Sequence, residues 1–197
     1  KASVDVTVTN KRIIEYFSHE RKKVYILPGF IASSGEGYPT TLGRGGSDYT
    51  AAIIGAALDA EVVEIWTDVS GMMTADPRMV NNIKQIPVIS YQEAMELSHF
   101  GAKVIYPPTI QPLMKKNIPV WIKNSFQPED EGTLIHNQPT DHKSILAGIS
   151  SINKIVLISL EGTGMIGIPG FSKRLFEALA QAKINVVLIT QSSSEHS

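Results

Sequence analysis

A glycine-rich segment, Thr41 to Asp48, combines residue types that bind anions and amino acids. Glycines let backbone N–H groups approach a ligand, and a helix that begins at Ser47 directs its positive end at the same point. Arg44 can hold a carboxylate or phosphate through two hydrogen bonds, and Asp48 suits an ammonium group or a metal ion. The segment is not a P-loop, because the Lys-Ser/Thr ending is missing. It predicts a ligand site; the alternative is a flexible loop with a helix N-cap.

A second polar segment, residues 66–78, follows a run of apolar residues that predicts a buried strand. In α/β proteins, ligands bind where the carboxyl ends of parallel strands lie. Thr67, Asp68 and Arg78 place a hydroxyl group, a carboxylate and a cation close together in sequence. We therefore expect this segment to have a functional role at a ligand site. The alternative for residues 76–78 is a turn with a surface ion pair.

The remaining reactive side chains have no spacing that indicates chemistry. Lys103 follows a glycine in a predicted loop, where a lone lysine is usually a solvated surface group. The histidines are scattered without metal-ligand spacing, so no metal site is predicted from them. Met72, Met73 and Met95 are expected to be packing residues.

Composition restricts the class of protein. A hydrophobic fraction of 43% against 19% charged residues is typical of a globular protein with a core. The formal net charge of −1 gives no reason to expect nucleic acid or an anionic membrane as a partner. The lack of cysteine excludes disulfides, and no apolar run reaches the roughly 18 to 20 residues of a membrane span. We therefore expect a cytoplasmic protein that handles small molecules.

Strands and helices alternate along the first two thirds of the chain. The patterns predict strands at 4–9, 24–27, 62–66 and 120–122, a hairpin-like turn at 35–37, and helices at 10–17, 47–58, 91–98 and 107–117. Ser90 and Glu93 are expected to form a capping box at the start of the third helix. This alternation predicts an α/β fold with a largely parallel sheet flanked by helices.

The sequence changes character at residues 126–143, where three consecutive acidic residues and two prolines predict a linker. Beyond it, the pattern predicts a strand at 155–160, an amphipathic helix at 172–181 and a second strand at 184–189. This βαβ unit is expected to be the opening half of a small α+β domain.

Together these segments resemble the aspartate kinase family, within the amino-acid kinase superfamily. The residues that carry the resemblance occur in family order: Leu42–Tyr49, Ile65–Val69, Asp76–Arg78, Ser90–Leu97, Phe100–Val104, Ile122–Asn124 and Gly132–Ile135. The resemblance implies transfer of the γ-phosphoryl group of ATP to the side-chain carboxylate of L-aspartate. The product is 4-phospho-L-aspartate, at the entry to threonine, methionine and lysine biosynthesis.

The resemblance also implies roles for individual residues. The aspartate substrate would be held by Arg44, Gly45, Gly46, Ser47 and Asp48, and the ATP site would be lined by Thr67, Asp68, Met73, Arg78, Lys103 and Val104. Met73 stands where many relatives have a tyrosine against the nucleotide. Lysines and Mg²⁺ would stabilise the charge on the transferring group.

The chain departs from the family where the catalytic lysine is expected. The Lys-Phe-Gly-Gly-Thr-Ser segment, whose lysine reaches the phosphates, does not occur in it, and neither does the substrate-binding glutamate region. The catalytic residues are therefore unknown. The start without methionine and the abrupt end at Ser197 predict a piece of a longer protein. We expect this piece alone to be inactive, an expectation that robust turnover by the purified fragment would contradict.

The sequence from about Ser144 resembles the first ACT domain of these kinases, especially that of bifunctional aspartokinase–homoserine dehydrogenases. This implies a partial catalytic domain at 1–136, a linker at 137–143 and an incomplete α+β ACT (ferredoxin-like) domain at 144–197. In such relatives threonine binds ACT sites and inhibits the kinase, which makes Asn185 and Gln191 the expected effector contacts. The alternative is that Asn185 only turns the chain and Gln191 faces solvent. The resemblance also implies a homo-oligomer.

Two other functions stay open at this point. One is a catalytically inert regulatory module that binds an amino acid through its ACT portion. Binding of threonine without binding of Mg-ATP would favour that module, and the reverse would favour the kinase. The other is a different amino-acid kinase, for glutamate or uridylate, against which the ACT-like tail and Tyr91–Ala94 argue.

Overall fold

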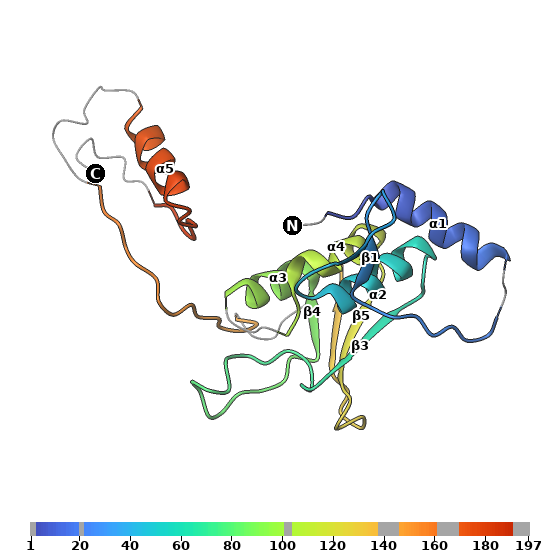
Figure 1. Cartoon of the computed structure of the whole chain (residues 1–197). Helices are drawn as coiled ribbons and strands as arrows, with labels where there is room; N and C mark the ends of the chain where they lie inside the picture. Colours follow the sequence, from blue (N-terminus) through green and yellow to red (C-terminus); the bar gives the residue numbers. More distant parts are fainter. Residues whose placement is uncertain (1–2, 20–21, 101–103, 138–145, 161–169, 191–197) are drawn as a thin grey trace. The chain divides into compact units, whose positions relative to one another are not determined.

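The computed structural model describes residues 3–19, 22–100, 104–137, 146–160 and 170–190. The chain divides into two compact units, Lys1–Ile152 and Asn153–Ser197. Figure 1 shows the elements of each unit in chain order. No helix in the described part of the chain is both long and apolar enough to cross a membrane.

A four-stranded sheet forms the centre of the first unit. Its strands run in the order β3 (Val63–Thr67), β5 (Val120–Asn124), β6 (Thr133–His136) and β4 (Val88–Ser90). β3 pairs with β5 and β6 with β4 in parallel, whereas β5 and β6 are antiparallel. The predicted α/β fold with a mostly parallel sheet is therefore confirmed, with one antiparallel pairing inside it.

Three predicted helices lie against this sheet: α2 (Gly46–Ala57), α3 (Tyr91–Phe100) and α4 (Pro107–Lys116). α2 and α4 pack side by side (Figure 1). The small residues of α2 allow a close approach to the sheet, since a Cβ atom on Gly55 would lie 2.6 Å from Val63 Cγ2. The capping box of α3 is confirmed: the Ser90 N–H donates to Glu93 Oε2 at 3.0 Å, and the Glu93 N–H donates to Ser90 Oγ at 3.2 Å.

The start of the chain differs from prediction. α1 (Val6–His19) includes most of the strand predicted at 4–9. Asp5 caps this helix, because its Oδ1 accepts a hydrogen bond from the Val8 N–H at 3.0 Å. The strand predicted at 24–27 is irregular and exposed, and the chain next forms a hairpin of β1 (Ile31–Ser33) and β2 (Pro39–Thr41) around the predicted turn.

β4 and β6 were not predicted as strands, and β6 lies inside the stretch interpreted as a linker at 126–143. That interpretation is wrong for residues 133–136. Thr133 and Ile135 are both fully buried and face the core, although they follow the exposed residues 125–129 closely in sequence.

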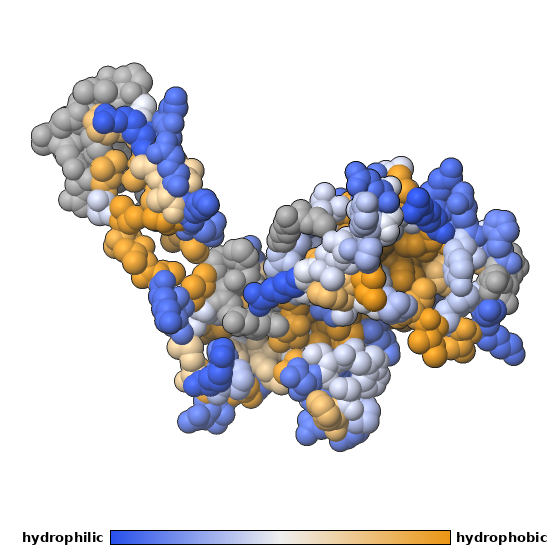
Figure 2. Space-filling view, viewed as in Figure 1, coloured by the Kyte–Doolittle hydropathy of each residue, from blue (hydrophilic) through white to orange (hydrophobic). Residues whose placement is uncertain are grey.

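The second unit contains α5 (Phe171–Gln181), which confirms the helix predicted at 172–181. The strands predicted at 155–160 and 184–189 are wrong: both segments are irregular. Their apolar side chains are largely exposed, with Leu157 at 93% and Leu188 at 79%, and apolar surface is visible on this unit in Figure 2. A strand forms only with a hydrogen-bonding partner, and within the described residues neither segment has one.

A buried hydroxyl group fixes the long segment between β3 and β4. Thr133 Oγ1 accepts a hydrogen bond from the Met72 N–H at 2.7 Å and donates one to the Ile86 carbonyl at 2.6 Å. The two ends of segment 72–86 are thereby joined to β6. Both ends of the segment, Met72 and Ile86, therefore meet the core at Thr133.

We predict that Thr133→Val lowers the free energy of unfolding by about 2 kcal/mol, because the isosteric valine leaves a buried N–H and a buried carbonyl without their partner. Urea denaturation followed by the fluorescence of Trp66 and Trp121 measures the change. Thr7→Val, at an exposed position of α1, is the matched control and should have little effect. Equal stability of the two variants would contradict the role of the hydroxyl group.

Candidate functional site

The glycine loop before α2 forms a tight turn. Gly43 and Gly45 have left-handed φ angles of 78° and 68°, and the Gly46 N–H donates to the Gly43 carbonyl at 3.0 Å. A Cβ atom on Gly45 would lie 2.9 Å from the Tyr106 and Thr109 side chains, whereas Gly43 has nothing within 4 Å. Packing against α4 therefore accounts for Gly45, and the open side of the loop lies at Gly43.

Arg44, Ser47 and Asp48 lie together at the N-terminus of α2, as predicted. Arg44 is exposed, and its guanidinium group lies 5.8 Å from the centre of the Tyr106 ring. Asp48 is half-buried in the first turn of the helix, and burial raises the pKa of its carboxyl group. The loop thus presents a cation, a hydroxyl group and a carboxylate around one helix end.

Thr67 and Asp68 lie where β3 ends. Thr67 Oγ1 donates to Asp68 Oδ1 at 3.1 Å, and the Thr67 carbonyl accepts a hydrogen bond from the Ser125 N–H at 2.8 Å. Since Thr67 is the register partner of Asn124, the ends of β3 and β5 lie level with each other. Asp68 remains exposed at this edge of the sheet.

A polar network beside Thr67 was missed from the sequence. Asn124 Nδ2 donates to Ser70 Oγ at 2.9 Å, and the Ser70 hydroxyl group donates to Asp130 Oδ2. Asn124 Oδ1 also accepts a hydrogen bond from the Phe126 N–H at 2.9 Å. A signal for this network was present: the amide side chain of Asn124 follows Val120 and Ile122 on the buried face of its strand.

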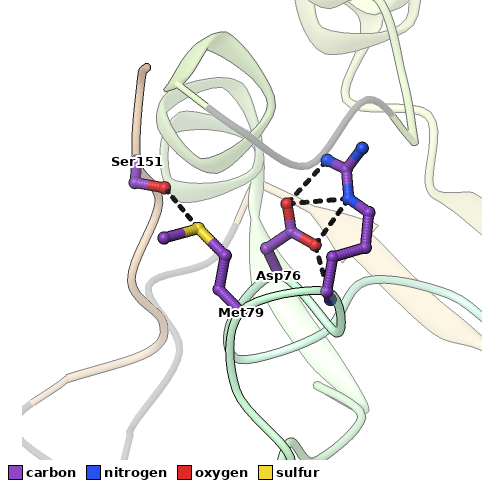
Figure 3. Close-up of polar contacts among 4 residues, drawn as sticks. Asp76, Met79 and Ser151 are labelled. Carbon is purple, nitrogen blue, oxygen red and sulfur yellow. Dashed lines mark hydrogen bonds and ion pairs between the residues drawn. The ribbon is translucent and has the colours of Figure 1, made fainter.

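Met73 and Arg78 belong to the segment between β3 and β4. Met73 is half-buried at the base of this segment, where it forms a bridge with Gln85. Arg78 lies on a turn further out and forms an ion pair with Asp76, with 2.6 Å between Nη2 and Oδ2 (Figure 3). No hydrogen bond or ion pair described in the structure joins Arg78 to Thr67 or Asp68. The alternative stated for residues 76–78, a turn with a surface ion pair, is therefore present. The Arg78 side chain in it is 77% exposed.

The other predicted site residues are dispersed. Val104 is half-buried against the core, and Lys103 lies outside the described residues. In the second unit, Asn185 is exposed in the segment after α5, and Gln191 lies outside the described residues. The described residues contain no group of three His, Cys, Asp or Glu side chains that could hold a metal ion.

Comparison with protein families matches the amino acid kinase family over residues 1–124 and an ACT domain over residues 158–197. The chain belongs to the amino acid kinase family. The predicted amino-acid-kinase fold and the ACT-type ending are thus confirmed at the level of the family.

Curated relatives support the same assignment. The chain is 45% identical to a chloroplastic bifunctional aspartokinase/homoserine dehydrogenase 1 of Zea mays, over 98% of this chain and 21% of the relative. It is 44% identical to the bifunctional aspartokinase/homoserine dehydrogenase of Haemophilus influenzae, over 100% of this chain and 24% of the relative. The chain therefore spans about a quarter or less of these relatives. The predicted resemblance to aspartate kinases of the bifunctional type is confirmed.

A solved amino acid kinase has the same arrangement of elements. The structure of Escherichia coli aspartokinase III in complex with aspartate and ADP is 36% identical, with a TM-score of 0.73 over 98% of this chain and 43% of that chain. Clostridium acetobutylicum aspartate kinase matches at 30% identity and a TM-score of 0.63, over 98% of this chain and 62% of that chain.

We predict that Arg78→Gln raises the pKa of Asp76. The side-chain hydrogen bond from Arg78 lowers this pKa from 3.8 to about 2, so removal of the guanidinium group should return it towards 3.8. In the native protein the pair stabilises the fold above pH 3.8, and this contribution is lost as the pH falls through about 2. NMR titration of the carboxyl carbon measures the shift.

Lys116→Gln is the control, because Lys116 pairs with the remote Asp59. It should leave the titration of Asp76 unchanged. An unchanged pKa of Asp76 in Arg78→Gln would show that the ion pair does not form in solution.

Proposed function

We propose that the protein containing this chain is an aspartate kinase, which transfers the γ-phosphoryl group of ATP to the β-carboxylate of L-aspartate. The observation that carries this proposal is the loop at the N-terminus of α2, which presents Arg44, Ser47 and Asp48 around one helix end. The similarity to a solved aspartokinase that contains aspartate and ADP supports the same substrates.

In this proposal the glycine loop binds the amino acid. The exposed Arg44 guanidinium group binds a carboxylate of aspartate through paired hydrogen bonds. Asp48 binds the ammonium group, and that positive charge counteracts the burial that raises the pKa of Asp48. The N-terminal N–H groups of α2 add partial positive charge at the same place.

The end of β3 and the following segment bind the nucleotide. Thr67 and Asp68 offer hydrogen-bonding groups at the edge of the sheet, and the exposed Arg78 offers a positive charge to the phosphates. The family resemblance adds Met73, Lys103 and Val104 to the expected ATP contacts, of which Lys103 lies outside the described residues. Mg²⁺ would neutralise phosphate charge; it needs only one or two protein carboxylates, and Asp68 is exposed where it could supply one.

The reaction needs no protein nucleophile. An oxygen atom of the aspartate β-carboxylate attacks the γ-phosphorus, the bond from that phosphorus to the bridging oxygen breaks, and ADP leaves with the bonding electrons. The protein's contribution is to align the two substrates and to stabilise the charge on the transferring group.

Regulation by threonine forms a second part of the proposal. The ACT match at residues 158–197 and the similarity to bifunctional enzymes support it, with Asn185 and Gln191 as the effector contacts. Lysine is the competing effector, because the lysine-sensitive aspartokinase 3 of Escherichia coli is 43% identical over 85% of this chain and 37% of its own length. A homo-oligomer, a cytoplasmic location and a linked homoserine dehydrogenase also remain predictions.

The decisive experiment is to trap aspartyl phosphate as its hydroxamate, with the complete protein that contains this sequence. We expect ATP-dependent product from L-aspartate and inhibition by threonine. Inhibition by lysine alone would retain the kinase and reject the threonine site. A folded complete protein that produces no hydroxamate from aspartate would reject the proposed reaction.

We predict that Asp48→Asn raises the KM for aspartate about tenfold or more, since the amide has no negative charge to attract the ammonium group of the substrate. The KM for ATP should change little, because Asp48 lies on the amino-acid side of the site. Lys115→Gln, at an exposed position near the end of α4, is the matched charge-removing control. Equal increases in the KM for aspartate and the KM for ATP would show that Asp48 does not act specifically on aspartate binding.

A further inference from the structure

Residues 148–151 lie against the turn that carries Asp76 and Arg78. The Ile149 N–H donates to the Thr74 carbonyl at 2.8 Å. The Ser151 hydroxyl group donates to Met79 Sδ at 3.2 Å, as Figure 3 shows. These two contacts fall two residues before Asp76 and one residue after Arg78. The ion pair is therefore bracketed on both sides by one short segment of the chain.

The segment is itself anchored on the core. A Cβ atom on Gly148 would lie 3.1 Å from both the Thr74 carbonyl oxygen and Leu97 Cδ2. Leu97 is a buried residue of α3, only 7% exposed. A Cβ atom at Gly148 would thus make a tighter contact than usual both with α3 and with the residue two positions before Asp76.

The turn that carries Arg78 is held by its own hydrogen bonds. Inside it, the Asp76 carbonyl accepts hydrogen bonds from the Met79 N–H at 3.0 Å and the Val80 N–H at 3.1 Å. Asp76 Oδ1 accepts a further bond from the Arg78 N–H at 2.9 Å. Arg78 and Met79 therefore belong to one hydrogen-bonded turn, and Thr74 lies two residues before it.

We propose that residues 148–151 are a positioning clamp that holds Arg78 in place for the nucleotide. Gly148, Ile149 and Ser151 are positioning residues: they contact the turn and act on the nucleotide through Arg78. This inference rests on the proposed function, in which the exposed Arg78 meets the phosphates of ATP. It assigns a role in nucleotide affinity to residues at the far end of the first unit, well outside the recognised motifs.

The test is Gly148→Ala in the complete protein. The added methyl group presses on the Thr74 carbonyl, so we expect the KM for ATP to rise about three- to tenfold. The KM for aspartate and kcat should change less than about twofold. Gly35→Ala is the matched control, because a Cβ atom there meets nothing within 4 Å, and both KM values should stay unchanged. An unchanged KM for ATP in Gly148→Ala, or an equal rise for both substrates, would overturn the clamp.

The double variant Gly148→Ala with Arg78→Gln separates positioning from a general loss of packing. If the clamp acts through Arg78, then Gly148→Ala should add no further rise in KM for ATP to the Arg78→Gln protein. Fully additive effects would show that Gly148 acts by another route and would reject the proposal.

Calorimetric titration with Mg-ATP tests the clamp without turnover. If the complete protein phosphorylates no aspartate but Gly148→Ala still binds Mg-ATP more weakly, the result would support the clamp and reject the proposed reaction. Should Gly148→Ala not fold, Ser151→Ala removes one contact from an exposed side chain and should weaken ATP binding about twofold. Unchanged binding by Ser151→Ala would then overturn the clamp.

Discussion

The parallel pairing of β3 with β5 fixes where the polar segments of this protein begin. Its register places Thr67 opposite Asn124, so both strands reach the same edge of the sheet together. The Thr67 carbonyl then binds the Ser125 N–H, and Asn124 binds Ser70 from the neighbouring strand's loop. A shift in this register would separate those groups.

Elements with local signals were predictable from the sequence, whereas those that depend on a partner were not. α2 and α4 begin and end within about a residue of their predicted limits, because glycine, proline and apolar spacing mark them locally. β4 and β6 are three and four residues long, too short for a periodic pattern. The alternation at 4–9 fits a strand equally well, and the cap at Asp5 decides for a helix.

The candidate site shows the same division. Arg44, Ser47 and Asp48 lie within five residues of one another in sequence, so their meeting at one helix end could be predicted. Ser70 lies 54 residues from Asn124 and 60 from Asp130, and only the sheet brings them together. The glycines are a weaker sign of a ligand site than the sequence suggests. Packing against α4 already excludes a side chain at Gly45, whether or not a ligand binds there.

The bond between Thr133 and Met72 joins residues 61 positions apart, and the contact of Ser151 with Met79 spans 72. A chain synthesised from its N-terminus therefore completes the turn bearing Arg78 late, after the glycine loop and α2 have left the ribosome. Until residue 133 emerges, the ends of the segment at 72–86 can bind each other, as in the bond from the Ile86 N–H to the Met72 carbonyl at 2.8 Å, but they are not joined to β6. The order of synthesis thus makes the loop before α2 available before the turn that carries Arg78 is complete.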